Sequence, residues 1–281
     1  MKKLVTIQDA SCFGKCSITV ALPIISAMGV ECAIIPTSIL STHTGGFKDF
    51  TFRDLSEDIP KIKEHWKKYD LKFDTIYTGY LGSHSQIDYV MDFARDFKGD
   101  DTLLFVDPAM GDKGRLYTGF DAEFPAHMAK LCAMADIIVP NMTEASFMLG
   151  IEYREEYDEE HVKNVLRSLC ALGAKKAVLT GVSFEKTTQG AMLYDSDTDT
   201  FYSHFQKNIP MSFHGTGDTF ASTFAGALTH GIDEKEALAL AVDFTVECIH
   251  STVPDVQDHW YGTKFEECLP SLILKMRELE K

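Results

Sequence analysis

The sequence predicts an α/β fold built on a mostly parallel β-sheet. Short apolar runs of strand length alternate along the chain with longer stretches in which apolar residues recur at helical spacing. A run at Leu4–Ile7, a polar glycine-containing loop, a helix over Ile18–Met28 and a second run at Cys32–Ile35 form a β-loop-α-β unit, from which parallel sheets are built. Several later runs end in polar or glycine-rich turns, which are typical of the ligand-binding edge of such sheets.

The remaining elements follow from the same signals. We expect a loop at Gln8–Lys15 and expect Pro36 to close the second strand. Further strands are expected at Thr75–Ser83, where a strand enters a glycine loop, and at Thr102–Val106, Ala135–Val139 and Ala177–Gly181. Helices are expected at Ser56–Tyr69, Ser85–Phe97, Glu155–Gly173 and Glu234–His250, with a final helix from Phe265. The segments Gly190–Tyr194 and Thr200–Phe205 are expected to pair as antiparallel strands at a sheet edge.

Length and charge favour a single domain that binds neither nucleic acid nor membranes. The chain has 281 residues, 45% of them hydrophobic, and no repeat, linker or low-complexity tract divides it, so we expect one domain over residues 1–281. Its 27 basic and 42 acidic residues give a net charge of -15, which repels nucleic acids and anionic membranes. An anionic substrate would need positive potential concentrated locally, through a helix terminus, a metal or a few Lys and Arg residues.

Cysteine usage and the apolar runs indicate a cytoplasmic protein. The 7 cysteines are scattered without a CxxC pair, which is typical of small buried side chains in a reducing compartment. The N-terminal apolar run is too short for a signal peptide, and no window approaches the ~18 apolar residues of a membrane span.

A glycine-bracketed turn, Phe213–Phe220, opens a helix rich in small and apolar residues. Gly215 and Gly217 let the backbone turn tightly around Thr216, so that N–H groups converge at a helix N-terminus, where an anion is favoured. Asp218 adds a carboxylate beside that anion site. It makes chemical sense as a base that takes a proton from an attacking hydroxyl while the N–H groups hold the charge developing on a phosphate. From these residues alone, the alternative is that Asp218 or Thr216 caps the helix.

The segment Thr37–Asp49 breaks the pattern of strands and helices. It is rich in hydroxyl side chains and has Gly45 and Gly46 at its tip. Two interpretations remain open, an exposed turn or a lid that carries hydrogen-bond donors over a pocket.

Two further turns place acidic side chains directly after predicted strands. Asp107 and Asp112 are five residues apart in one turn, so both can reach one Mg²⁺ directly or through its waters, although Asp107 followed by proline can also simply end the strand. Asn141 and Glu144 open a helix that runs to Leu149, and they match a capping box. Glu144 is equally suited to act as a second carboxylate for Mg²⁺ or its water shell.

The order of these motifs resembles the ribokinase-like superfamily. The polar loop is followed by T-S-x-x-S-T-H-T-G, T-G-Y-L-G-S, D-P-x-M-G-D, P-N-x-x-E, L-T-G and then G-T-G-D-T-F at a helix start. Within the superfamily the chain resembles the pyridoxal/pyridoxine/pyridoxamine kinases, the vitamin B6 kinases, over roughly residues 4 to 275. The resemblance implies a three-layer αβα sandwich with a mostly parallel central sheet, and it weakens the capping interpretation of Asp218.

The resemblance also assigns roles to individual residues. Asp218 matches the catalytic base that deprotonates the substrate's hydroxymethyl group, and the N–H groups of Gly215, Thr216 and Gly217 match the anion hole for the γ-phosphate. Asp112 and Glu144 match the acidic positions near Mg²⁺. Asp107 and Asn141 lie beside this acidic pair, and Tyr117 and Thr180 match positions near the ATP phosphates. The positions expected at the vitamin pocket are Asp9, Ser11, His43, Thr44 and Tyr80. The stretch Thr252–Val256 is expected to flank the adenine.

The first loop departs from the family pattern. Where the B6 kinases have a serine, this chain has Asp9, and Ser17-Ile18 replaces a Gly-Asn pair. In having an aspartate at this position, the chain resembles the related hydroxymethylpyrimidine kinases. Its carboxylate can accept a hydrogen bond from a ring substituent or pair with an amine, so our hypothesis is that Asp9 favours pyridoxamine or pyridoxine over the aldehyde. Thr42 also replaces the asparagine of the family's S-N-H-T segment.

The resemblance therefore implies ATP- and Mg²⁺-dependent phosphorylation of the 5′-hydroxymethyl group of a B6 vitamer. It implies ATP and a small aromatic alcohol as partners, a homodimer, and a monovalent cation as a further candidate cofactor. A kinase of hydroxymethylpyrimidine or another small alcohol would use the same phosphate motifs and differ at pocket residues such as Phe13. A non-catalytic vitamin- or nucleotide-binding protein on a kinase fold remains a third possibility, although it would have little use for Asp218 at an anion hole.

Overall fold

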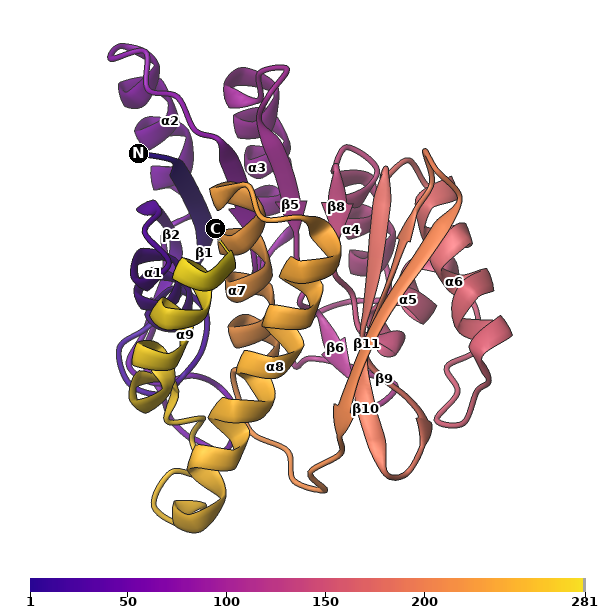
Figure 1. The fold of residues 1–281 in the computed structure, drawn as a ribbon. Coiled ribbons are helices and arrows are strands. Elements are labelled where there is room, and N and C mark those ends of the chain that lie inside the picture. Colours follow the sequence, from indigo (N-terminus) through magenta and orange to yellow (C-terminus); the bar gives the residue numbers. More distant parts are fainter. Residues whose placement is uncertain (280–281) are drawn as a thin grey trace.

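The centre of the structure is a nine-stranded β-sheet (Figure 1). The computed structural model describes residues 1–279. Along the sheet the strands lie in the order β11-β10-β9-β8-β5-β4-β1-β2-β3. Their bounds are β1 Lys3–Ser11, β2 Glu31–Leu40, β3 Phe52–Asp54, β4 Thr75–Thr78, β5 Leu103–Val106, β8 Ile137–Ile138, β9 Lys176–Glu185, β10 Thr188–Asp195 and β11 Thr200–Lys207. A separate hairpin consists of β6 (Gly111–Asp112) and β7 (Arg115–Leu116).

The middle of the sheet is parallel and its two ends are antiparallel. β1 pairs in parallel with β2 on one side and β4 on the other, and β4, β5, β8 and β9 continue the parallel series. β9–β10, β10–β11 and β2–β3 are antiparallel. The predicted mostly parallel sheet and the predicted antiparallel pair at its edge are both confirmed.

Helices cover both faces of the sheet, which gives the predicted three layers (Figure 1). One face carries α1 (Ile18–Ala27), α7 (Thr216–His230), α8 (Glu234–Thr252) and α9 (Phe265–Leu279). The other face carries α2 (Ile59–Lys67), α3 (His84–Phe97), α4 (Phe124–Cys132), α5 (Met142–Leu149) and α6 (Glu159–Ala171). Short 3-10 turns lie at Ser56–Asp58 and Val253–Asp255. Within residues 1–279, no helix combines the length and apolar character needed to cross a membrane.

Each face of the sheet has its own hydrophobic core, because successive strand residues point to opposite faces. In β5, Leu104 and Val106 belong to the core under α2–α6, whereas Phe105 belongs to the core under α1 and α7–α9. Ile76 and Tyr77 divide in the same way in β4. All five side chains are fully buried, so these central strands are covered on both sides, as parallel strands usually are.

The first two strands are longer than the sequence predicted. β1 continues to Ser11 through the expected loop, and β2 runs past Pro36. The proline is tolerated because β3 pairs only with the last three residues of β2, so that residue 36 lies where β2 is the edge of the sheet. The register between β1 and β2 shifts between Gln8 and Ala10, and Asp9 lies at this irregularity.

Two elements between β5 and β8 were not predicted. Strands of two residues, as in the β6–β7 hairpin, have no readable period, and the nine residues of α4 follow a glycine-rich loop. Helix α6 begins at Glu159, later than the expected Glu155, because Asp158 is its N-cap and accepts the His161 N–H at 2.8 Å.

Helix α9 offers a matched test of the core beneath it. Leu272 is fully buried, whereas Leu274 on the same helix is 59% exposed. We expect Leu272→Ala to lower the free energy of unfolding by about 2–5 kcal/mol, because the substitution removes buried methyl groups and leaves a cavity. Leu274→Ala should change it by less than about 0.5 kcal/mol. Urea unfolding of both variants measures the difference, and equal losses would contradict this packing of α9.

Candidate active site

A cavity of about 900 Å³ lies along the carboxyl edge of the parallel strands and is bounded by the start of α7. Most of the residues that the sequence singled out for the site line it: Asp9, Ser11, His43, Thr44, Tyr80, Asp107, Asp112, Tyr117, Asn141, Glu144, Thr180, Gly215, Thr216, Gly217 and Asp218. They come together because the carboxyl ends of parallel strands meet at one edge of the sheet.

The site residues follow the order of the strands along this edge. Thr180 lies in β9, Asn141 and Asp107 follow β8 and β5, and Tyr80 follows β4, next to Asp9 in β1. The chain order reverses at β1, which has β2 on one side and β4 on the other, and open α/β sheets bind ligands at such switch points. The predicted phosphate contacts and the predicted vitamin pocket therefore occupy different ends of one cavity.

Asp9 is a buried carboxylate fixed by two hydroxyl groups. Ser17 Oγ donates to its Oδ1 at 2.5 Å, and Ser11 Oγ donates to its Oδ2 at 3.2 Å. Burial raises the pKa of Asp9, and these hydrogen bonds oppose the shift. Ser17 reaches this place with φ 54, a left-handed conformation that suits glycine better. Ser17 thus has the backbone conformation of the glycine that the family pattern has at this position, and its hydroxyl group orients Asp9.

Both ring nitrogens of His43 are already bonded to the main chain. The Gly45 N–H donates to Nδ1 at 3.1 Å, and Nε2 lies 2.8 Å from the Tyr261 carbonyl oxygen. Since a carbonyl only accepts, Nε2 carries the proton and the ring is neutral. Burial lowers the pKa of His43, which favours the same form. In this arrangement His43 ties the Thr37–Asp49 segment to the loop before α9.

Aromatic rings from separate segments pack around His43. The Phe47 ring lies 5.1 Å from His43 and 4.6 Å from Trp260, between ring centroids. Gly46 approaches Trp260 so closely that an added Cβ would lie 2.7 Å from its ring. The Thr37–Asp49 segment is therefore packed rather than freely exposed, with Thr37–Leu40 in β2 and with His43, Thr44 and Gly45 lining the cavity, and its role as a lid stays a prediction.

The glycine-bracketed turn forms the N-terminus of α7. Gly215 has φ 76, and an added Cβ would lie 1.8 Å from the Lys15 carbonyl oxygen, so only glycine allows this contact. Gly215 is also the N-cap residue, and the Thr216 hydroxyl donates to the Phe213 carbonyl at 3.3 Å. Neither Thr216 nor Asp218 therefore occupies the capping position that the alternative interpretation required. The first N–H groups of α7 lack intrahelical partners, as at any helix start.

Asp218 lies in the first turn of α7 and lines the cavity. Burial raises its pKa to about 7, the charge of Asp9 adds to the shift, and a hydrogen bond from the Ser17 backbone N–H opposes it. A carboxylate with a pKa near neutrality can both accept and release a proton at physiological pH.

Two further carboxylates are buried on the other side of the cavity. Glu144 Oε2 accepts the Asn141 N–H at 2.8 Å and Oε1 accepts the Met110 N–H at 3.1 Å, so the predicted capping box is present. Burial raises the pKa of Glu144 to about 7, and the charge of Asp112 adds to it. Burial, together with the charges of Glu144 and Asp218, also raises the pKa of Asp107 well above its usual range.

This donor set fits a divalent cation. Within residues 1–279, no hydrogen bond reaches the Asp107 carboxylate, and Glu144 keeps further lone pairs beside its backbone contacts. Asp112 is exposed to the cavity. No group of three or more His, Cys, Asp or Glu side chains in this part of the chain forms a complete metal cage. Mg²⁺ needs none, because it uses one or two carboxylates together with waters and substrate phosphates.

The β6–β7 hairpin is fixed against the start of α5. Asn141 Nδ2 donates to the Gly111 carbonyl at 2.8 Å, and the Gly114 N–H donates to Thr143 Oγ1 at 2.9 Å. Tyr117 follows the hairpin and lines the cavity, with its N–H donating to the Met110 carbonyl at 2.9 Å. This unpredicted element therefore positions both Asp112 and Tyr117.

Sequence reasoning missed part of the cavity wall. The additional lining residues include Cys16, Ser17, Lys113, Lys207 and His214, and Val242, Thr245, Val246 and Ile249 of α8. His214 directly precedes the Gly-Thr-Gly turn, which was an available signal, and its ring centroid lies 4.9 Å from that of His43. The predicted residues Phe13 and Thr252–Val256 are not among those that line the cavity. Phe13 is 51% exposed and packs on Tyr261, with 4.8 Å between ring centroids.

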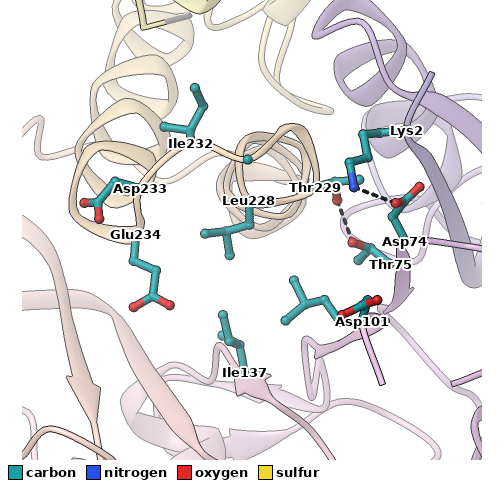
Figure 2. Close-up of a pocket in the computed structure, with 12 residues that line it drawn as sticks. Lys2, Asp74, Thr75, Asp101, Ile137, Leu228, Thr229, Ile232, Asp233 and Glu234 are labelled. Atoms are coloured by element: carbon teal, nitrogen blue, oxygen red, sulfur yellow. Dashed lines mark hydrogen bonds and ion pairs between the residues drawn. The ribbon is translucent and has the colours of Figure 1, made fainter. Parts of the chain in front are cut away.

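A second cavity, of about 380 Å³, lies at the opposite edge of the sheet (Figure 2). Figure 2 shows Lys2 pointing toward Asp74, and Thr229 toward Thr75, within it. These polar groups are partnered with one another at 2.7 Å in both pairs. Because ligands of open α/β sheets bind at the carboxyl ends of the strands, the larger cavity is the candidate active site.

The family model described as phosphomethylpyrimidine kinase matches residues 12–261. The chain belongs to this family. Its match spans the first helix, the whole parallel sheet beyond β1, and α7 with Asp218.

Two solved structures show the same fold over nearly the whole chain. The first is a protein from Bacteroides thetaiotaomicron assigned as a phosphomethylpyrimidine kinase, in a crystal form with pyridoxal. It is 38% identical, with a TM-score of 0.92 and coverage of 96% of this chain and 95% of that one. The second is pyridoxal kinase from Lactobacillus plantarum, which is 32% identical, with a TM-score of 0.89 and coverage of 98% and 97%. The resemblance to vitamin B6 kinases that the motifs predicted is confirmed.

A curated relative, the chloroplastic thiamine biosynthetic bifunctional enzyme of Arabidopsis thaliana, is 24% identical over 93% of this chain. The chain spans about half of that relative, 51% of its length.

The turn before α7 gives a test of the site's backbone. We expect Gly215→Ala to lower the free energy of unfolding by about 2–4 kcal/mol. Alanine would have to adopt a left-handed backbone conformation, and its Cβ would clash with the Lys15 carbonyl oxygen. Gly217→Ala is the matched control, because no atom lies within 4 Å of its added Cβ. It should be neutral or stabilise by about 0.5 kcal/mol. Urea unfolding distinguishes the two, and a tolerated Gly215→Ala would refute the close contact.

Proposed function

We propose that this protein is an ATP-dependent kinase that phosphorylates the 5′-hydroxymethyl group of a vitamin B6 vitamer, pyridoxal, pyridoxine or pyridoxamine, in the salvage of pyridoxal 5′-phosphate. The observation that carries the proposal is Asp218, a carboxylate with its pKa raised to about 7 at the N-terminus of α7. Support also comes from the relative that is 38% identical and was crystallised with pyridoxal, and from the 32% identical pyridoxal kinase.

In this mechanism Asp218 accepts the proton of the substrate hydroxyl as its oxygen attacks the γ-phosphorus. The bond from the γ-phosphorus to the bridging oxygen breaks, and ADP leaves while Asp218 holds the proton. A pKa near 7 suits a base that must be ionised before the reaction and protonated after it. The N–H groups of Gly215, Thr216 and Gly217 donate to the phosphoryl oxygens, on which charge develops.

The acidic side of the cavity would handle the nucleotide phosphates. Asp112 and Glu144 would hold Mg²⁺, which neutralises phosphate charge when bound. Asp107 lies beside them, and Asn141, Thr180 and Tyr117 extend this side of the wall. The monovalent cation and the homodimer that the resemblance implies stay predictions.

The acceptor would bind at the β1 and β4 end of the cavity. Asp9, oriented by Ser11 and Ser17, supplies a fixed acceptor for a ring substituent. Burial and the charge of Asp9 raise the pKa of Tyr80 to about 12, so Tyr80 is a neutral donor at physiological pH. Its ring packs on Phe120 at 5.5 Å between centroids, which fixes its position. The aromatic side chains of Tyr80 and His43, which line this end of the cavity, suit a flat aromatic substrate.

A second candidate, a kinase of hydroxymethylpyrimidine, is supported by the matching family model and by Asp9. ATP turnover with Mg²⁺ against pyridoxal, pyridoxine, pyridoxamine, hydroxymethylpyrimidine and a few sugars separates the two. We expect turnover with at least one B6 vitamer. Turnover with hydroxymethylpyrimidine alone would replace the proposed substrate, and no turnover with any acceptor would remove the proposal.

Asp218→Asn tests the base directly. We expect the variant to lose at least ~10²–10⁴-fold in kcat, the usual contribution of a general base, because an amide cannot accept the proton. ATP affinity, measured by calorimetry, should stay largely unchanged. Turnover equal to that of the wild type would rule out Asp218 as the base and favour a different role for the anion site.

The pH dependence of kcat/KM gives an independent check on Asp218. Because the raised pKa is about 7, the carboxylate is protonated and inactive as a base at lower pH. We expect kcat/KM to fall roughly tenfold per pH unit below about pH 7 and to level off above it. An aspartate with an ordinary pKa of ~4 would give a flat profile between pH 5 and 8. Because burial also raises the pKa of Glu144 to about 7, the profile is compared with that of Asp218→Asn, whose residual turnover should depend on pH less steeply than the wild type does.

A further inference from the structure

The charges that line the active-site cavity are strongly unbalanced. Five carboxylates line it, and they are Asp9, Asp107, Asp112, Glu144 and Asp218. Only two lysines, Lys113 and Lys207, line it within residues 1–279. ATP and the transferring phosphoryl group are anions, so each of these ammonium groups matters more here than it would in a neutral cavity.

Lys113 is held at a defined place by its hairpin. It forms the turn between β6 and β7 with φ 50, and its backbone N–H donates to Asp112 Oδ1 at 2.9 Å. The next residue, Gly114, is bonded to Thr143 Oγ1 and lies against Tyr153, where an added Cβ would be 2.7 Å from the ring. The turn is therefore fixed to the start of α5, and Lys113 is one of the residues that line the cavity.

This place lies between the predicted metal ligands and the anion hole. On one side, Lys113 directly follows Asp112. On the other side, its charge acts on His214, the residue before Gly215, and helps to lower the pKa of that imidazole after burial and His43. Lys207 ends β11 at the far antiparallel end of the sheet, next to the Gln189 and Gly190 side of the wall.

The Lys113 ammonium has no acidic partner among the ion pairs of residues 1–279. Some lysines of the fold are paired, such as Lys63 with Asp96 at 2.9 Å and Lys264 with Asp255 at 2.6 Å, whereas Lys207, like Lys113, has no partner among these ion pairs. An unpaired ammonium on a flexible stem, beside an anion hole, is suited to bind an anion that arrives with the substrate.

We propose that Lys113 is a catalytic residue whose ammonium binds the transferring γ-phosphoryl group, between Asp112, which would hold Mg²⁺, and the N–H groups of α7. The assignment rests on the proposed kinase function. Lys113 donates hydrogen bonds to the non-bridging γ-oxygens and transfers no proton. Phosphoryl transfer depends mainly on such positioned charges, because charge spreads over these oxygens in the transition state.

The test compares Lys113→Met with the wild type in nucleotide binding and in turnover. With Mg²⁺, calorimetry should show that the variant binds the non-hydrolysable β,γ-imido analogue of ATP about tenfold or more weakly, while ADP affinity changes less than about twofold. With the acceptor that the wild type uses, kcat should fall on the order of 10²-fold. Lys113→Arg should recover part of both losses, since it keeps the charge. Equal weakening for the analogue and ADP, or no loss of analogue binding, would overturn the assignment.

Lys130→Met is the matched control. Lys130 is an exposed lysine on α4 outside the cavity, so its removal makes the same change in net charge. We expect Lys130→Met to bind the analogue and to turn over as the wild type does. If Lys130→Met lost as much analogue affinity and kcat as Lys113→Met, the effect would come from overall charge and the assignment would be rejected. If the wild type phosphorylates no acceptor in the panel, the proposed function fails by itself. The comparison of analogue with ADP still decides whether Lys113 contacts the γ-phosphate.

Discussion

The contact between the Gly215 backbone and the Lys15 carbonyl is the constraint on which the site depends. It brings the N-terminus of α7 against the loop after β1, although the two segments are 200 positions apart in the chain. From that contact, Ser17 bonds Asp218 through its backbone N–H and Asp9 through its hydroxyl. One serine thus sets the relative positions of the proposed base and the residue proposed to bind the acceptor. Any side chain on Gly215 would separate them.

The cavity keeps its carboxylates in an environment that disfavours their charge. Burial is the first cause of the raised pKa of Asp107, Glu144 and Asp218, and their mutual repulsion adds to the shift of Asp107. Backbone N–H groups offset part of this for Glu144. A metal ion and Lys113 would supply the positive charge that these carboxylates lack. The repulsion among the carboxylates lowers the stability of the empty protein, and a bound complex of metal and nucleotide would relieve it.

The fold and most of the residues that line the candidate site could be predicted because their signals are local. Asp218 belongs to a turn of a few residues, and Asp107 and Asn141 directly follow apolar runs. The rest depends on contacts that short patterns do not record. His43 is bonded to Tyr261, 218 positions away, which no inspection of the Thr37–Asp49 segment reveals. Lys113 lies on a hairpin whose strands are two residues long, and the α8 wall residues look like an ordinary buried helix face.

The division of the hydrophobic core between the two faces of the sheet also shapes how the chain can fold. Tyr77 and Phe105 belong to the central strands, yet the helices that cover them on that face include α7, α8 and α9, which come after every strand of the sheet in chain order. Until those helices are made, only α1 shields this face of the parallel strands. The nascent chain therefore presents an apolar sheet surface until α7 has been made, so this face of the sheet can close only after all of its strands exist.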